Sequence, residues 1–289
     1  APVALRVNPD VDAQTHKYIS TGKSHNKFGI GIDRIVGVYE QAAALPHLEL
    51  RGIQTHIGSQ ILETAPFVEA LEKLAPIVTE LKARHGIKFF SIGGGVGIIY
   101  RGVLESGAPA WWDIGEDPKR ISFDSYASAL KPLLQGLGLK ILLEPGRSLV
   151  GNAGVLLASV LYVKRTPAKT FIITDAGMND LIRPALYEGH HEIVPLREPT
   201  DGAPVQPVDV VGPVCESGDF FAQDREIPDL APGDGVAVLS AGAYGFVMAS
   251  NYNSRRLPAE VLVDGGRADI VRERQTWDDL IAGERIPSR

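Results

Sequence analysis

The chain has 289 residues, of which 44% are hydrophobic and 22% are charged, and its formal net charge is −6. This length allows two domains with a substantial core, and an acidic balance without a long basic run argues against a nucleic-acid partner. No apolar stretch is long enough to span a membrane, we expect neither a signal nor a transit peptide, and a single cysteine excludes an internal disulfide framework. These features predict an enzyme-like protein of the cytoplasm.

The first half of the sequence alternates apolar strand patterns with helical periodicity. The predicted strands cover residues 3–7, 48–55, 87–92 and 139–143, and the predicted helices cover residues 34–45, 67–81 and 122–137, with Ser122 as a cap. Short strand–helix units of this kind form parallel sheets with crossover helices. A doubly wound sheet is the alternative, but the polar loops described below follow three strands at their carboxyl ends, as on the upper face of a barrel. We therefore predict that residues 1–150 form the C-terminal half of a TIM-like (β/α)8 barrel.

Residues 151–289 have a different pattern, which predicts an all-β domain. Short segments rich in β-branched residues are separated by Gly, Pro and Asp clusters, and they cover residues 155–163, 171–174, 208–211, 236–239 and 261–263. No long helical pattern is evident in this half.

In the first half, residues 106–120 include Trp111 and Trp112 among prolines and glycines, which predicts a surface loop, with an interface as the alternative.

Loops after two of the predicted strands carry residues suited to an aromatic, phosphorylated cofactor. His56 has a flat face that can pack on a ring, and the nearby Ser59 offers a hydroxyl to phosphate. Gly93, Gly94 and Gly95 let successive backbone amides approach an anion. Each feature has a structural alternative, namely a structural histidine in the first case and a tight strand-to-helix turn in the second.

Glu144, Gly146 and Arg147 follow the last predicted strand of the first half. A carboxylate against a pyridine nitrogen keeps that nitrogen protonated, which makes the ring a strong electron sink. An arginine can hold a phosphate or a substrate carboxylate through two parallel hydrogen bonds. A surface ion pair is the structural alternative, which the intervening Pro145 and Gly146 make less attractive. Together, these loops favour a pyridoxal phosphate site.

Further candidate residues lie in the second half. Arg183 and Tyr187 occupy a turn-rich segment, and Tyr244 lies between glycines, which suits a cofactor lid. The sole cysteine, Cys215, is adjacent to Glu216 and is a candidate proton donor. Solvated or packing roles remain the alternatives for each of them. Two adjacent histidines in this half lack companion ligands, so no metal site is predicted.

Jointly, these segments resemble one known family. The matching stretches are residues 6–9, 26–30, the three loops, and residues 177–180, 212–219 and 241–245. They are similar to the diaminopimelate decarboxylases, pyridoxal-phosphate-dependent enzymes that join an alanine-racemase-like barrel to a β domain. The resemblance covers nearly the whole chain. It implies decarboxylation of meso-2,6-diaminopimelate to L-lysine and carbon dioxide, a step of lysine biosynthesis.

The resemblance also implies roles for the candidate residues. Those that would bind the cofactor are His56, Ser59, Gly93, Gly94, Gly95, Glu144, Gly146, Arg147 and Tyr244. Those that would receive the substrate are Arg147, Arg183, Tyr187, Glu216 and Tyr244. Residues that match Cys215 and Glu216 reach into the partner's site in this family. This implies a homodimer with shared active sites, in which Cys215 is the catalytic proton donor.

The expected substrate follows from charge. A distal amino-acid centre presents a carboxylate and an ammonium, which Arg183 and Glu216 complement. Decarboxylation of another amino acid, such as ornithine or arginine, is an alternative, although an arginine here would repel the lone distal ammonium of ornithine. The family's cofactor-bound lysine lies on an early barrel strand, and no lysine of this chain has a matching context. We therefore expect a truncated form that binds the cofactor poorly, with a non-catalytic regulatory or binding homologue as the alternative.

Overall fold

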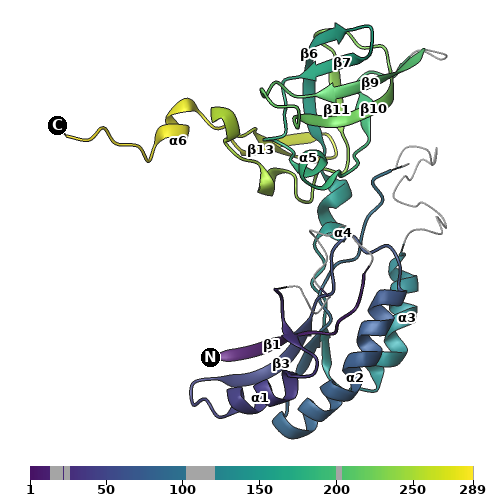
Figure 1. The fold of residues 1–289 in the computed structure, drawn as a ribbon, viewed down its shortest axis with the longest axis vertical. Helices are drawn as coiled ribbons and strands as arrows, with labels where there is room; N and C mark the ends of the chain where they lie inside the picture. The colour runs from purple at the N-terminus through teal and green to yellow at the C-terminus, as the bar shows by residue number, and fades with distance from the viewer. Residues whose placement is uncertain (14–21, 23–26, 102–120, 200–203, 289) are drawn as a thin grey trace. The chain divides into compact units, whose positions relative to one another are not determined.

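Figure 1 shows the computed structural model, which describes all residues except 14–21, 23–26, 102–120, 200–203 and 289. The chain divides into two compact units. The first comprises Ala1–Ile99 and Leu104–Val150, and the second comprises Tyr100–Val103 and Gly151–Arg289. Among the described residues, no helix is both long enough and apolar enough to cross a membrane. The loop predicted around Trp111 and Trp112 lies outside the described residues.

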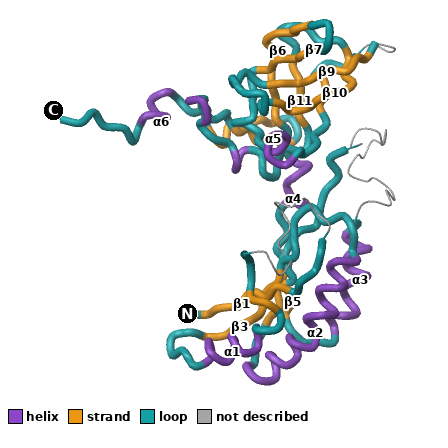
Figure 2. Tube along the Cα trace, viewed as in Figure 1, coloured by secondary structure: helices purple, strands orange, loops and turns teal. Residues whose placement is uncertain are grey.

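The first unit contains a parallel sheet of five strands (Figure 2). Their order across the sheet is β2 (Ile30–Gly31), β1 (Pro2–Asn8), β3 (Glu49–Thr55), β4 (Phe89–Ser91) and β5 (Lys140–Leu142). The strands predicted in this half are confirmed. The additional strand β2 escapes prediction because two residues are too few to show an alternating pattern. It pairs with the end of β1 at Val7 and Asn8.

Helices pack on one face of this sheet (Figure 1). They are α1 (Ile35–Ala43), α2 (Ala65–His85) and α3 (Phe123–Gln135), and α2 and α3 lie side by side. The face of α2 predicted from helical spacing is buried, and its members are Phe67, Leu71, Leu74, Val78 and Leu81. The predicted cap of α3 is also confirmed, because the Ser122 hydroxyl accepts a hydrogen bond from the Ser125 N–H at 3.0 Å.

The register of the sheet separates an apolar row from a polar row. Residues paired across neighbouring parallel strands point to the same face, and successive residues of one strand point to opposite faces. The apolar row packs in the core with the helices, and it consists of Leu5, Ile53, Phe90 and Ile141. The next residues along three of these strands form the polar row, which consists of Arg6, Gln54 and Ser91. The polar row therefore lies on the face opposite the helices.

The second unit contains a six-stranded sheet and a separate two-stranded sheet (Figure 2). In order, the strands of the larger sheet are β10 (Phe220–Pro228), β9 (Val205–Val211), β7 (Thr170–Thr174), β6 (Leu156–Arg165), β11 (Gly235–Val238) and β8 (Ile193–Pro195). The smaller sheet pairs β12 (Glu260–Asp264) with β13 (Arg267–Arg272). The helix α4 (Arg147–Val150) ends the first unit. The helical elements of the second unit are short: α5 (Arg183–Tyr187), α6 (Trp277–Ile281) and 3₁₀ turns at Gly151–Ala153, Phe246–Met248 and Tyr252–Ser254. The predicted β character of this half is confirmed.

Three strands of the second unit escape prediction for identifiable reasons. β10 carries charged residues at its centre, and its pairing register shifts next to Asp224, which has a left-handed φ of 48°. β13 reads RADIVR, with charged residues at both ends. β8 has three residues, too few for a pattern.

Candidate active site

The carboxylate of Glu144 lies beside the polar row. Its Oε1 accepts a hydrogen bond from Ser91 Oγ at 2.5 Å, and its Oε2 accepts one from Gln54 Nε2 at 3.2 Å. Glu144 follows β5, and its backbone N–H donates to Gly93 O at 2.9 Å. Two neighbouring strands thus hold both oxygens of an acceptor-only carboxylate. The orientation of this carboxylate on the polar face is therefore fixed by the sheet.

His56 follows β3 at the same end of the sheet. Its Nδ1 accepts a hydrogen bond from the Gly94 N–H at 3.2 Å, and its carbonyl oxygen accepts one from Arg6 Nη2 at 3.0 Å. Burial, and then the Arg6 cation, lower the pKa of His56 below its usual value, while the Glu144 carboxylate opposes this shift. An imidazole that accepts at Nδ1 and resists protonation is neutral near pH 7. His56 therefore supplies an uncharged flat ring.

The three glycines hold neighbouring loops in close contact. A Cβ added at Gly94 would lie 2.1 Å from Glu144 O, and one added at Gly95 would lie 2.2 Å from Gly58 O. Gly93 and Gly95 also have φ values of 75° and 100°, in the region that favours glycine. Close packing thus accounts for these glycines, and their amides lie at the carboxyl end of β4.

Ser59 and Arg147 meet although they are far apart in the sequence. Arg147 Nη2 donates a hydrogen bond to Ser59 Oγ at 3.2 Å, and Arg147 is buried at the start of α4. The neighbouring Gly146 has open space, because a Cβ added there would have no described heavy atom within 4 Å. A hydroxyl beside a guanidinium forms a donor pair suited to an anion.

The donor set of the first unit fits pyridoxal phosphate. The Ser59 hydroxyl and the Arg147 guanidinium suit a phosphate, and the neutral ring of His56 suits the face of a pyridine. The oriented carboxylate of Glu144 suits the ring nitrogen. The structure thus brings the cofactor residues predicted in this unit to the carboxyl end of one parallel sheet.

The polar row is not among the predicted site residues. Arg6, Gln54 and Ser91 lie within strands, where a single polar residue is typical of ordinary alternation. One signal was available: each lies at most two residues before the carboxyl end of its strand. Parallel pairing aligns such positions, and it therefore places these side chains beside the loops that carry His56 and Glu144.

In the second unit, Arg183 and Tyr187 are the first and last residues of α5. Arg183 is buried, with its Cζ 4.2 Å from the centroid of the Tyr100 ring and its Nη1 2.6 Å from His191 Nε2. Tyr187 is half-buried, whereas Tyr244 is 41% exposed and has a left-handed φ of 58°. Within the described part of the chain, no group of His, Cys, Asp and Glu is arranged to hold a metal ion.

Cys215 and Glu216 are exposed in the loop between β9 and β10. Glu216 Oε2 accepts a hydrogen bond from the Tyr252 hydroxyl at 2.6 Å, a partner that nothing in the sequence indicated. The loop is anchored by the buried Asp219, whose carboxylate accepts the Val214 N–H at 2.6 Å. The predicted proton donor and the predicted ammonium acceptor thus lie on one anchored loop.

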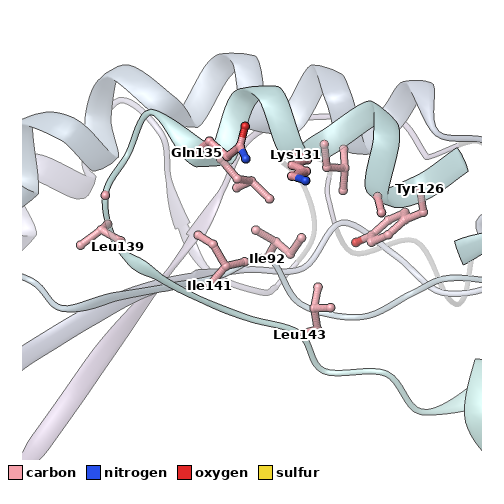
Figure 3. A pocket seen from close by; sticks show the side chains of 11 residues that line it. Ile92, Tyr126, Lys131, Gln135, Leu139, Ile141 and Leu143 are labelled. Atoms are coloured by element: carbon pink, nitrogen blue, oxygen red, sulfur yellow. The ribbon is translucent and has the colours of Figure 1, made fainter. Parts of the chain in front are cut away.

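An apolar hollow of about 420 Å³ lies between α3 and β5 (Figure 3). Leu139, Ile141 and Leu143 line one side, and Tyr126 and Lys131 of α3 line the other. β5 is the last strand in the sheet order, so its outer edge has no hydrogen-bonded strand among the described residues. None of the predicted site residues lines the hollow, which is therefore separate from the cluster around Glu144.

Comparison with known proteins identifies the family of this chain. Residues 12–242 match the family model described as pyridoxal-dependent decarboxylase, C-terminal sheet domain. The diaminopimelate decarboxylase of Pseudomonas aeruginosa is 51% identical over 287 residues, and that of Aquifex aeolicus is 46% identical over 282 residues. These alignments cover 99% and 97% of this chain, but 65% and 63% of the two relatives. The chain thus spans slightly less than two thirds of their length.

Solved structures show the same likeness. The diaminopimelate decarboxylase of Helicobacter pylori complexed with L-lysine matches with a TM-score of 0.87 and 40% identity, over 98% of this chain and 66% of that one. The diaminopimelate decarboxylase of M. jannaschii in complex with L-lysine matches with a TM-score of 0.85 and 36% identity, over 99% of this chain and 64% of that one. The predicted architecture, a partial barrel followed by a β domain, is confirmed. The chain belongs to the pyridoxal-dependent decarboxylase family.

Proposed function

We propose that this chain serves the pyridoxal-phosphate-dependent decarboxylation of meso-2,6-diaminopimelate, which yields L-lysine and carbon dioxide in lysine biosynthesis. The proposal rests chiefly on the carboxylate of Glu144, which Ser91 and Gln54 orient at the end of the sheet where the neutral His56 also lies. The identity of 51% to the diaminopimelate decarboxylase of Pseudomonas aeruginosa supports this substrate over others.

When bound, pyridoxal phosphate supplies an electron sink for the bond that breaks as carbon dioxide leaves. Glu144 holds a proton on the ring nitrogen, which strengthens that sink, and its two hydrogen bonds keep it oriented. His56 packs an uncharged ring on the cofactor, so it adds no positive charge beside the protonated nitrogen. Ser59 and Arg147 bind the phosphate, assisted by the amides of the glycine loop.

The distal end of the substrate carries both a carboxylate and an ammonium. Arg183, Arg147 and Tyr187 receive the carboxylate, while Glu216 receives the ammonium and Tyr244 contacts both cofactor and substrate. The L-lysine in the two solved relatives supports this assignment, because lysine retains the distal amino-acid centre of diaminopimelate. Ornithine presents a lone distal ammonium, which makes ornithine or arginine the weaker alternative.

The proton donor and the assembly are part of the same proposal. Cys215 protonates the carbon that loses carbon dioxide. Cys215 and Glu216 are both exposed on the same loop, which supports a homodimer in which this loop completes the partner's active site. The proposed location of the homodimer is the cytoplasm.

The first experiment asks where the cofactor attaches. The protein at its natural length is incubated with pyridoxal phosphate and reduced with borohydride, and the modified lysine is mapped by mass spectrometry. Among the described lysines, Lys88 and Lys140 lie at the end of the sheet opposite the candidate site. Lys27 is the lysine to compare, because its Nζ lies 5.2 Å from the centroid of the Phe28 ring, which Arg6 of the polar row also contacts.

Each outcome of this mapping has a distinct meaning. A single adduct on a lysine beyond these 289 residues, with release of carbon dioxide from meso-diaminopimelate, is the expected result. An adduct on Lys27 would contradict the expected truncation, since the reactive lysine would then lie within this chain. No adduct and no carbon dioxide would favour a non-catalytic binding or regulatory homologue.

Arg183→Ala tests the substrate assignment. Loss of a hydrogen-bonded charge should raise the KM for meso-diaminopimelate about tenfold or more. The matched control is Arg197→Ala, because Arg197 is an exposed arginine in the same unit. An unchanged KM for meso-diaminopimelate in the Arg183 variant would rule out the role assigned to this residue.

A further inference from the structure

We propose that His191 is a positioning residue, which fixes the guanidinium of Arg183 for the distal carboxylate of the substrate. This inference rests on the proposed function, in which Arg183 receives that carboxylate. His191 is completely buried, and it belongs to a histidine pair that has no role in the reaction as described above. It lies in the second unit together with Arg183 and Tyr100.

The hydrogen bonds of the His191 ring define its protonation state. Nδ1 lies 2.7 Å from Leu239 O, and Nε2 lies 2.6 Å from Arg183 Nη1. A carbonyl oxygen only accepts hydrogen bonds, and a guanidinium only donates them. The ring must therefore carry its proton on Nδ1 and accept at Nε2. An imidazolium would direct an N–H at the Arg183 cation, so the neutral ring is the form that fits.

Aromatic contacts restrict the guanidinium further. Arg183 Cζ lies 4.2 Å from the centroid of the Tyr100 ring, in a cation–π contact. The Tyr100 and His191 rings meet edge to face, with centroids 5.1 Å apart and planes at 77°. A Cβ added at Gly189 would lie 3.3 Å from Arg183 Nη2, so glycine leaves the guanidinium its space. Tyr100 therefore restricts the guanidinium by packing against it, and His191 restricts it through a directional hydrogen bond.

Fixing this side chain has a consequence for binding. An arginine that is free in solution loses side-chain entropy when it holds a ligand, and a preorganised one avoids that cost. The planar guanidinium also binds a carboxylate best in a defined orientation. Removal of the His191 acceptor should therefore weaken ligands that have the distal carboxylate and spare ligands that lack it.

The test compares matched variants of the protein at its natural length. His191→Phe keeps a buried ring but removes the acceptor, and His191→Gln restores an acceptor. His190→Phe is the control, because His190 contacts Glu192 and Arg225 rather than Arg183. The ligands are meso-diaminopimelate, L-lysine as an inhibitor with the distal carboxylate, and 1,5-diaminopentane as an inhibitor without it.

For His191→Phe we expect the KM of meso-diaminopimelate and the Ki of L-lysine to rise about tenfold, as for one hydrogen bond to a charged group. The Ki of 1,5-diaminopentane should not change, and His191→Gln should recover part of the loss. In an Arg183→Ala background, His191→Phe should add no further loss, because it acts through Arg183. An equal weakening of both inhibitors, or no weakening in a folded variant, would overturn the proposal.

Two further results separate the possible failures. If Arg183→Ala itself leaves KM unchanged, then the proposed function fails at Arg183, irrespective of His191. If His191→Phe does not fold, the tautomer of His191 in the unaltered protein is measured by ¹⁵N-resolved NMR of the imidazole. A neutral ring protonated at Nδ1 is expected, and an Nε2–H tautomer or an imidazolium would overturn the assigned contact with Arg183.

Discussion

Replacing Gly94 with alanine should push apart the loops that follow β4 and β5. The added Cβ would lie 2.1 Å from Glu144 O and 3.1 Å from Glu144 C, whereas ordinary contacts begin at 3.4 Å. Both partners are backbone atoms, so rotation of a side chain cannot relieve the clash. Overpacking of this kind costs about 1–3 kcal/mol of folding free energy. The clash displaces Glu144, which is also the proposed partner of the ring nitrogen. Cofactor binding should therefore weaken about tenfold for each 1.4 kcal/mol of binding free energy that is lost.

The matched control is Gly136→Ala. Gly136 follows α3 with a φ of −66°, and a Cβ added there would have no described heavy atom within 4 Å, so alanine should be neutral or slightly stabilising. Denaturant titration gives the free energy of unfolding for both variants, and absorbance titration with pyridoxal phosphate gives their dissociation constants. Equal stability and equal cofactor affinity in the two variants would refute the packing role assigned to Gly94.

Other predictions concern hydrogen bonds and protonation. Ser91→Ala removes the 2.5 Å hydrogen bond to Glu144, and it should weaken cofactor binding about tenfold or more in an absorbance titration, as for a bond to a charged group; unchanged affinity would count against that bond. Burial lowers the pKa of His56 in the folded protein, so the unfolded chain takes up the proton more readily. The stability that the neutral ring provides is fully present above the unfolded-state pKa of 6.5, and it is lost as the pH falls from there through the lower folded-state pKa. An NMR midpoint for His56 above 6.5 would contradict this. The hydrogen bond to Glu216 raises the pKa of Tyr252 above 10.0, so the phenol form is favoured until the pH rises through the raised value. Subtracting the ultraviolet titration of a Tyr252→Phe variant from that of the parent protein isolates the titration of Tyr252. Its midpoint should fall toward 10.0 when the same subtraction is made in a Glu216→Gln background, and an unchanged midpoint would exclude the contact.

Prediction from the sequence succeeded where local pattern determines structure. The strands that became β1, β3, β4 and β5 have apolar alternation or short apolar runs bounded by turn residues, and the buried face of α2 recurs at helical spacing. Prediction failed where pattern is short or interrupted, as in the two-residue β2 and in β10 with its charged centre. Tertiary pairing overrides local preference in such segments, because the partner strand supplies the hydrogen bonds.

The candidate site divides along the same line. The groups proposed to contact the cofactor or substrate, such as His56, Glu144 and Arg183, have residue types that suggest their chemistry wherever they occur. Residue type does not predict the roles of Ser91 and His191, which orient these groups, because each acts through a partner that only the fold brings within hydrogen-bond distance. The register of two parallel strands brings Ser91 to Glu144. His191 can accept a hydrogen bond from Arg183 because the carbonyl oxygen of Leu239 keeps the ring proton on Nδ1. A carboxylate or guanidinium held in this way pays less entropy on binding than a free side chain. The orienting residues should therefore affect KM and cofactor affinity more than they affect the folding of either unit.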